Sequence, residues 1–251
     1  MSPILLLAMA AVELPPICAD RPAKANGTCT VPAGHVQVEA GLVGWSLVKV
    51  AGTRTTVLTL APTTIKYGLT SSSDLEVAVT PFAKLQVKHG ASVSGFGDTL
   101  LRYKRRLTTE AAPVQVALIP FVKVPTARHA MGNGKVEGGL AVPISFSLPK
   151  GVTMTLGPEA DLLADADGHG RHLGIINLVN IAGPVAPRLT LAGELWSNFN
   201  VDPAGTARQA SADASLAYAV SSNMQLDAGA NVGFTSDSPD LELYGGLSVR
   251  L

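Results

Sequence analysis

Residues 223–234 read NMQLDAGANVGF, and this stretch decides the fold because apolar and polar side chains alternate along it without a break. Leu226 and Val232 fall on one face of an extended chain, and Asp227 falls on the other. A period of two indicates a β-strand with one apolar and one polar face. The stretch is also longer than the roughly five or six residues that are usual for strands of water-soluble proteins.

The same pattern continues on both sides, over residues 209–220 and 241–251. A water-soluble β-sandwich would show the same alternation, so the length of the strands decides between the two folds. A tilted strand needs about 9–11 residues to cross a bilayer. We therefore expect an all-β protein, a transmembrane antiparallel up-and-down β-barrel with lipid outside and a polar lumen.

The composition suits a membrane barrel. Charged residues make up 15% of the chain, the mean hydropathy is +0.29, and 19 basic residues balance 19 acidic ones. A cytosolic protein with so little charge would be short of solubility, and a nucleic-acid-binding protein would need a basic face. Aromatic residues, at 5%, are fewer than the aromatic girdles of transmembrane barrels commonly require.

The N-terminus predicts export. Residues 1–19 are expected to be a signal peptide, with an apolar core over residues 4–12 and cleavage after Ala10 or Ala19, although no Lys or Arg precedes Asp20. Cleavage after Ala10 leaves Cys18 free to form a disulfide with Cys29 in an oxidising periplasm, whereas cleavage after Ala19 leaves Cys29 alone. Residues 20–33 are rich in turn formers and are expected to form a periplasmic segment before the barrel, residues 34–251.

Alternation along residues 34–251 predicts about twelve strands, an even number as in bacterial single-chain barrels. Short connections, such as residues 71–73, alternate with longer ones, such as 127–134 and 201–206, so both termini should lie in the periplasm. The strand over residues 74–88 should carry a bulge at Pro81, with Lys84 and Gln86 facing inward. Residues 171–182 are apolar on both faces, so their register is open.

Several motifs carry a resemblance to a known family. In chain order they are Asp20-Arg21-Pro22, Val31–Gly41, Gly95–Asp98 with Tyr103–Arg106, Pro120–Thr126, and Pro239–Leu241 with Tyr244–Ser248. In their order and spacing they resemble a family of bacterial outer-membrane transporters labelled "MetA pathway of phenol degradation". The resemblance implies a twelve-stranded barrel in the outer membrane and the passage of small molecules, hydrophobic or aromatic ones among them.

The inward-facing charged residues and one tryptophan form the candidate site. They are Glu39, Glu76, Asp98, Arg102, Lys104, Lys123, Glu137, Glu159, Asp161, Glu194, Trp196, Asp213, Asp227, Glu242 and Arg250. Charges in a narrow lumen must be paired or hydrated, since an isolated buried ion is very costly. They either form a salt-bridge lattice that fills the barrel or select the solute, and both roles are compatible at different heights.

We expect a channel for small molecules, not an enzyme, with no catalytic residue, no metal and no cofactor. The alternatives are a lipase-like hydrolase embedded in a barrel and a structural or adhesion barrel. The histidines, His35, His89, His129, His169 and His172, lie mostly at expected loops or strand ends, with no serine-hydrolase context. His169 and His172 near Asp165 and Asp167 offer metal ligands, but a polar, solvated loop explains them better. The expected partners are the lipid bilayer, an unidentified solute and the barrel-assembly machinery during insertion, with no nucleic acid.

Overall fold

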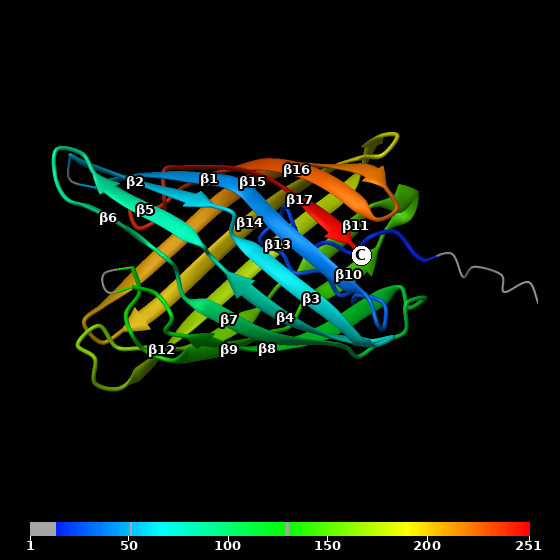
Figure 1. The fold of residues 1–251 in the computed structure, drawn as a ribbon, viewed down its shortest axis with the longest axis horizontal. Helices are drawn as coiled ribbons and strands as arrows, with labels where there is room; N and C mark the ends of the chain where they lie inside the picture. The colour runs from blue at the N-terminus through cyan, green and yellow to red at the C-terminus, as the bar shows by residue number, and fades with distance from the viewer. Residues whose placement is uncertain (1–13, 51, 129–130) are drawn as a thin grey trace, which may run out of the picture.

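The computed structural model describes residues 14–50, 52–128 and 131–251 as one closed, antiparallel β-barrel (Figure 1). The barrel closes where β1 pairs with β17, from Gln37 opposite Arg250 to Leu47 opposite Leu241. A short 3-10 turn, η1 (Pro149–Gly151), accompanies the strands. The strands are β1 (Val36–Val50), β2 (Thr53–Leu60), β3 (Thr63–Thr70), β4 (Ser73–Val79), β5 (Phe82–Val87), β6 (Ser92–Gly95), β7 (Thr99–Arg106), β8 (Val114–Val124), β9 (Glu137–Ala141), β10 (Ile144–Ser147), β11 (Thr153–Leu156), β12 (Glu159–Ala164), β13 (Arg171–Ala186), β14 (Leu189–Asp202), β15 (Gly205–Ser221), β16 (Met224–Gly233) and β17 (Leu241–Arg250).

These segments make 12 barrel strands, as the sequence predicts, because several strands consist of two segments in line. Four of the interruptions fall at Pro62, Pro81, Pro143 and Pro158. Proline has no N–H for the strand ladder, so it is tolerated at a bulge or break. The interrupted strands all lie between β2 and β12, whereas β13 to β17 run unbroken.

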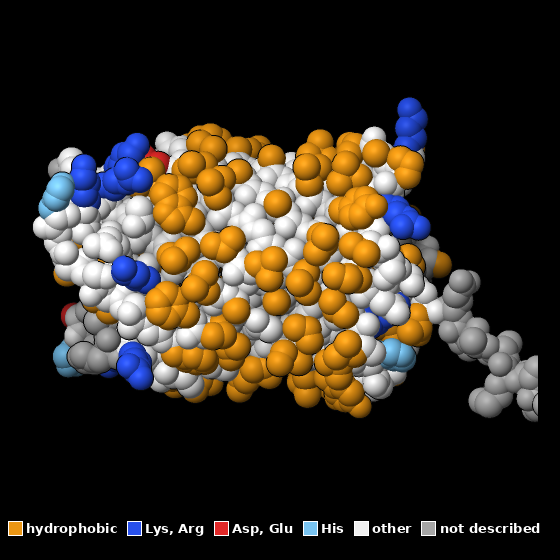
Figure 2. All heavy atoms as spheres, turned by 45° about the horizontal axis from the view of Figure 1, so that its top comes forward, with side chains coloured by type: hydrophobic (Ala, Val, Ile, Leu, Met, Phe, Trp, Pro, Cys, Tyr) orange, Lys and Arg blue, Asp and Glu red, His pale blue; other side chains and the backbone are white. Residues whose placement is uncertain are grey.

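The molecule is apolar outside and charged inside. Leu226 on β16 and Leu243 on β17 are 42% and 46% exposed, whereas Asp227, which follows Leu226 on β16, is 8% exposed. Figure 2 shows the apolar side chains as a broad belt across the visible face of the barrel, with blue Lys and Arg side chains at both ends of it. Exposed apolar area of this extent marks a surface that contacts lipid. The assignment of the apolar face to lipid, on which the fold prediction depends, is therefore confirmed.

The bulge expected at Pro81 is present, between β4 and β5, and it reverses the facing of the residues beyond it. Ala83 is buried in the interior, and the exposed Phe82 starts the outward series that continues through Lys84 and Gln86. The prediction that Lys84 and Gln86 face inward is wrong. A break in the ladder shifts the two-residue period by one position, and every later side chain then changes face.

Most connections sort by length between the two ends of the barrel, although the connection between β1 and β2 is short and that between β7 and β8 is long for their ends. The C-terminus and the first described residues lie at the same end, together with the turns at residues 71–72 and 222–223 (Figure 1). The long connections 125–136 and 234–240 lie at the other end. Residues 201–206, expected to form a long loop, contain only a two-residue turn between β14 and β15. Among the described residues, no helix is long and apolar enough to cross a membrane.

Candidate functional site

The N-terminal segment enters the barrel. Residues 17–33, the plug, run through the interior and are closed on themselves by a Cys18–Cys29 disulfide. At its start, the backbone N–H of Ile17 donates to the carbonyl of Ser222 and the side-chain amide of Gln37 donates to the carbonyl of Cys18. The segment expected in the periplasm, residues 20–33, therefore lies inside the lumen.

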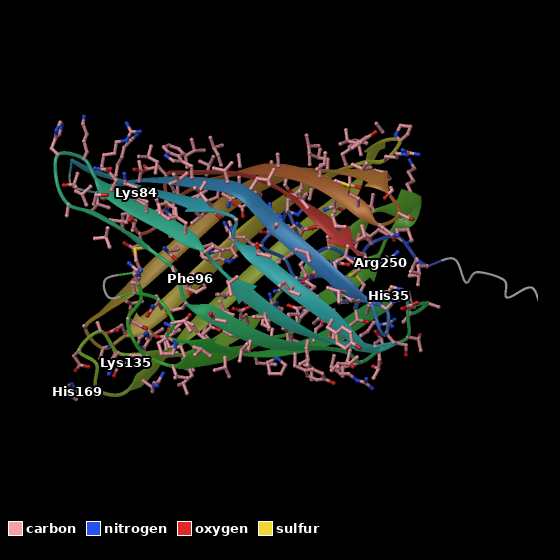
Figure 3. All side chains as sticks on the ribbon, in the orientation of Figure 1. His35, Lys84, Phe96, Lys135, His169 and Arg250 are labelled. Carbon is pink, nitrogen blue, oxygen red and sulfur yellow. A yellow bond between two sulfur atoms is a disulfide. The ribbon has the colours of Figure 1, made fainter. Side chains whose placement is uncertain are left out.

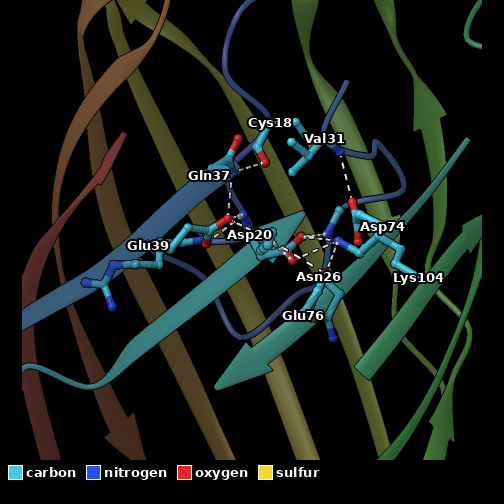
Figure 4. A network of polar contacts seen from close by, with 12 residues as sticks. Cys18, Asp20, Asn26, Val31, Gln37, Glu39, Asp74, Glu76 and Lys104 are labelled. Carbon is cyan, nitrogen blue, oxygen red and sulfur yellow. Dashed lines mark hydrogen bonds and ion pairs between the residues drawn. The ribbon is translucent and has the colours of Figure 1, made fainter. Parts of the chain in front are cut away.

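Asp20 holds the plug to one side of the wall (Figure 4). Its carboxylate accepts hydrogen bonds from Lys66 Nζ at 2.5 Å and from Lys104 Nζ at 2.8 Å, and both lysine side chains are almost completely buried. Lys66 also contacts Glu39 at 2.5 Å, and Lys104 lies 3.5 Å from Glu76. Alternating positive and negative groups of this kind compensate the desolvation that each buried charge would otherwise suffer.

The same lysines set the ionisation of Asp20. Burial alone would raise the pKa of its carboxyl group, but Lys104, Lys66 and Arg102 outweigh burial and hold that pKa well below its ordinary value. The carboxylate therefore stays charged across the physiological pH range.

Arg21 and Lys24 hold the plug to the opposite side of the wall. The guanidinium of Arg21 donates to Asp227 on β16 at 2.6 Å, and Lys24 Nζ donates to Asp213 on β15 at 2.9 Å. Gly246 makes room for Arg21, because a Cβ atom there would clash with the guanidinium. The plug thus bridges β3 and β7 on one side and β15 and β16 on the other.

Wall carboxylates also bind the backbone of the plug. Glu194 accepts the N–H groups of Lys24 and Ala25, and Asp74 accepts the N–H of Val31. Residues 18–30 form no strand and pair with none. Side chains therefore satisfy plug N–H groups that a β-strand would satisfy by ladder pairing.

Three interior cavities border the plug, with volumes of about 270, 210 and 370 Å³. The first is lined by the rings of Phe121 and Trp196 and by Arg102 and Glu159, with Lys24 Nζ 4.8 Å from the centre of the Trp196 ring. Ile176 and Leu178 of β13 line the same cavity. This explains why β13 is apolar on both faces: one face meets lipid and the other meets this cavity.

The structure turns the predicted lumen residues to the interior and gathers most of them into three groups. Glu39, Glu76, Arg102 and Lys104 surround Asp20; Glu194, Asp213, Trp196 and Glu242 surround Lys24; and Asp98, Lys123 and Glu137 form ion pairs nearer the long loops. Glu159 lines the first cavity, Asp161 lies against Gly139, and Arg250 stands apart and donates to Asn223. A selective role for these residues stays a prediction.

Sequence reasoning missed the plug residues and Lys66. A strand-by-strand pattern does not show that an irregular segment folds back into the barrel. One feature of the sequence could have indicated the plug: three charged residues, Asp20, Arg21 and Lys24, lie between Cys18 and Cys29. For Lys66, the signal was its charge, since residues 55–73 contain no other charged residue. Thr64, two positions before it, pairs with the inward-facing Glu39, so Lys66 faces inward as well.

His35 contacts the end of the plug at Pro32 and Ala33, whereas His169 and His172 lie in another part of the barrel. His172 is 7% exposed, and its Nδ1 lies 2.8 Å from Asp165 and 3.6 Å from Asp202. These three residues connect the loop of residues 165–170 to the end of β14, and they bring possible metal-ligand atoms within 4.8 Å of one another. His169 is exposed and is hydrogen-bonded to Asp167, and His129 lies outside the described residues.

The comparisons agree with this architecture. A family model described as "Putative MetA-pathway of phenol degradation" matches residues 19–251. The chain belongs to this family. No curated protein matches the chain.

Three solved barrels show the same fold. An outer membrane channel from Pseudomonas putida F1 is similar with a TM-score of 0.76 at 14% identity, over 92% of this chain and 100% of that one. The NanC porin has a TM-score of 0.56 at 10% identity, over 86% of this chain and 100% of that one. The translocator domain of the autotransporter NalP from Neisseria meningitidis has a TM-score of 0.54 at 10% identity, over 87% and 89%. At these identities the likeness extends to the fold, that of outer-membrane β-barrels.

Proposed function

We propose that the protein is a gated outer-membrane channel, in which small molecules pass through the polar lumen when the plug moves. The observation that carries this proposal is the plug itself. It occupies a closed barrel between three cavities, and it is held by ion pairs and side-chain contacts without strand pairing. Such contacts can exchange for water when the segment moves, whereas a paired strand would have to be pulled from the sheet.

The first cavity supports a solute with an aromatic ring and a polar group. A cavity of about 150 Å³ accommodates benzene, and this one measures about 270 Å³. Trp196 and Phe121 offer ring contacts, which favour an aromatic partner by about 0.5–1.5 kcal/mol. Glu159 also lines this cavity and has no ion-pair partner among the described residues, so its carboxyl group can face a polar group on the solute. The similar barrel from Pseudomonas putida F1 is an outer membrane channel, and the family is described by phenol degradation, so both support passage of this kind.

Conductance tests the channel. The full chain in planar bilayers should give low conductance at rest with brief openings, and disruption of the plug should lengthen them. Absence of conductance together with esterase activity would support the hydrolase alternative. Absence of both conductance and esterase activity would support a structural or adhesion barrel. Against a hydrolase, no serine hydroxyl is hydrogen-bonded to a histidine within residues 14–50, 52–128 and 131–251.

Fluorescence tests the solute site. The chain has two tryptophans, so Trp45→Phe leaves Trp196 as the sole indole. Added 4-nitrophenol, an aromatic quencher, should quench Trp196 with saturation, and Phe121→Ala should weaken this about threefold to tenfold through the lost ring contact. Quenching that rises linearly without saturation, or is unaffected by Phe121→Ala, would contradict a site there. Channel activity in bilayers is measured independently of this result.

We infer that the signal peptide is cleaved before Cys18 and not after Ala19. The support is the Cys18–Cys29 bond, which closes the plug inside the lumen and requires both cysteines in the mature protein. The intact mass of the protein purified from outer membranes tests this. A mass that begins at Asp20 would contradict it. A requirement for the barrel-assembly machinery stays a prediction.

A further inference from the structure

The outer surface of the barrel carries a cluster of basic side chains at the end with the long loops. The cluster, called the rim patch, consists of Lys49 on β1, Arg54 on β2, and Lys84 and Lys88 at β5. Figure 2 shows blue side chains beyond the apolar belt at this end as well as at the other, and Figure 3 labels Lys84 among the outward side chains of this end. None of these four residues belongs to an ion pair within the described part of the chain.

Strand register places three of these cations in one row. Lys49 is directly opposite Arg54, and the backbone N–H of Lys88 donates to the carbonyl of Arg54 at 2.8 Å. Neighbouring strands lie about 4.8 Å apart, so the row spans roughly 10 Å. Like charges directly opposite one another destabilise a sheet. Asp240 accepts the backbone N–H of Lys49 at 2.6 Å but forms no ion pair with the three side chains, so an anion across the row would relieve their repulsion.

From this row toward the middle of the barrel, the outer surface of β1, β2 and β5 changes from charged to apolar. The next row on this side consists of Thr56 and Gln86, with Leu47 buried beside them. It is followed by Trp45, Leu58 and Lys84 and then by Val43, Leu60 and Phe82. The last row is wholly apolar and exposed, at 44%, 40% and 36%. Each step is about 6.8 Å along the strand. A shallow groove of about 390 Å³, lined by Arg54, Thr56, Gln86, Lys88 and His89, lies at the cationic end of this gradient.

We propose that the rim patch binds the phosphorylated head of a lipopolysaccharide molecule, whose acyl chains lie against Val43, Leu60 and Phe82. The inference rests on the outer-membrane location, where the outer leaflet consists of lipopolysaccharide and its lipid A carries phosphates. The gradient of the three strands matches such a lipid in order: anionic head, polar linkage, acyl chains. The head phosphates would also remove the repulsion within the cationic row.

The opposite rim lacks this arrangement. Its exposed basic residues include Arg105, Lys150 and Arg188, which lie on β7, on η1 and in the turn before β14. Arg105 donates to Ser72 and Arg188 donates to the carbonyl of Val220. These three cations lie on three separate elements and not opposite one another in a strand pair, so they supply a control with the same loss of charge.

The test is a titration of the purified full chain in detergent with Kdo2-lipid A, followed by native mass spectrometry. One basic residue near an anionic membrane surface contributes about a fivefold gain in affinity. The triple variant K49Q/R54Q/K88Q should therefore bind roughly a hundredfold more weakly, and R105Q/K150Q/R188Q should bind like the wild type. Binding should weaken as ionic strength rises, because exposed charges are screened. A heat-modifiability gel verifies that each variant is folded.

Several outcomes would overturn the proposal. One is unchanged affinity in K49Q/R54Q/K88Q, and another is an equal loss in the control variant. Equal binding of dephosphorylated lipid A would show that acyl chains alone are recognised. Competition by inorganic phosphate at the same concentration as the lipid would assign the row to free phosphate and not to a lipid. Conductance is unaffected by any of these outcomes, so the channel proposal is judged separately.

Discussion

Replacement of Asp20 by Asn should release the plug. Asp20→Asn keeps the size of the side chain but removes the charge that faces Lys66 Nζ at 2.5 Å and Lys104 Nζ at 2.8 Å. Loss of one partner from a buried ion pair costs about 3–5 kcal/mol. Lys66 keeps Glu39 at 2.5 Å and Lys104 keeps Glu76 at 3.5 Å, so we expect the lower end of this range.

A cost of about 3 kcal/mol corresponds to roughly a hundredfold change in the ratio of displaced to seated plug, since about 1.4 kcal/mol is a factor of ten. Single-channel recording in planar bilayers measures this ratio as open probability. The conductance of the open state should not change, because the lumen wall is the same. Only the time spent open should increase.

The matched control is Asp98→Asn. Asp98 is also a lumen carboxylate that faces a lysine, Lys123 at 3.2 Å, and its other hydrogen bond goes to Ala127 and not to the plug. The Asp98→Asn variant should keep the open probability near the wild-type value. If Asp98→Asn opens the channel as much as Asp20→Asn, or if Asp20→Asn leaves it closed, the ion pairs of Asp20 do not hold the plug and the argument fails.

Three further results are expected. Cys18→Ser/Cys29→Ser, or reduction of the wild type, should raise open probability, because the disulfide closes the plug into a loop that fits the lumen; unchanged recordings in reductant would count against this. The pKa of Asp20 is lowered in the folded protein, so its contribution is complete above the unfolded value of about 3.9 and is lost as pH falls below it. Open probability should therefore rise as pH falls below about 4, and this rise should be absent in Asp20→Asn. Leu195→Arg should lower the free energy of unfolding of the barrel by about 2–4 kcal/mol, because Leu195 lies mid-strand on the lipid face at 61% exposure. A urea titration in lipid vesicles measures this, with Leu195→Ala as the control. Equal midpoints for the two variants would contradict the assignment of this face to lipid.

Most of the wall could be predicted from the sequence. Alternation in long segments depends on the two-residue period of a strand, which is a local property. The inward placing of Asp227 and Glu242 followed directly from it. The prediction failed at Lys84 and Gln86, because a one-position shift at Pro81 reverses every later side chain, and the sequence shows the proline but not how the chain passes it.

By itself, the sequence determined the class of the protein: a barrel of about twelve strands with lipid outside and charge inside. Only the tertiary structure decided what the charges do. Lys66, Lys104, Asp213 and Asp227 are far apart in the chain, and they become one site because the plug reaches each of them through Asp20, Arg21 or Lys24. Contacts of this kind depend on where an irregular segment lies in three dimensions, and no periodicity encodes that position. The same holds for the rim patch, since the pairing of β1, β2 and β5 brings its cations into one row.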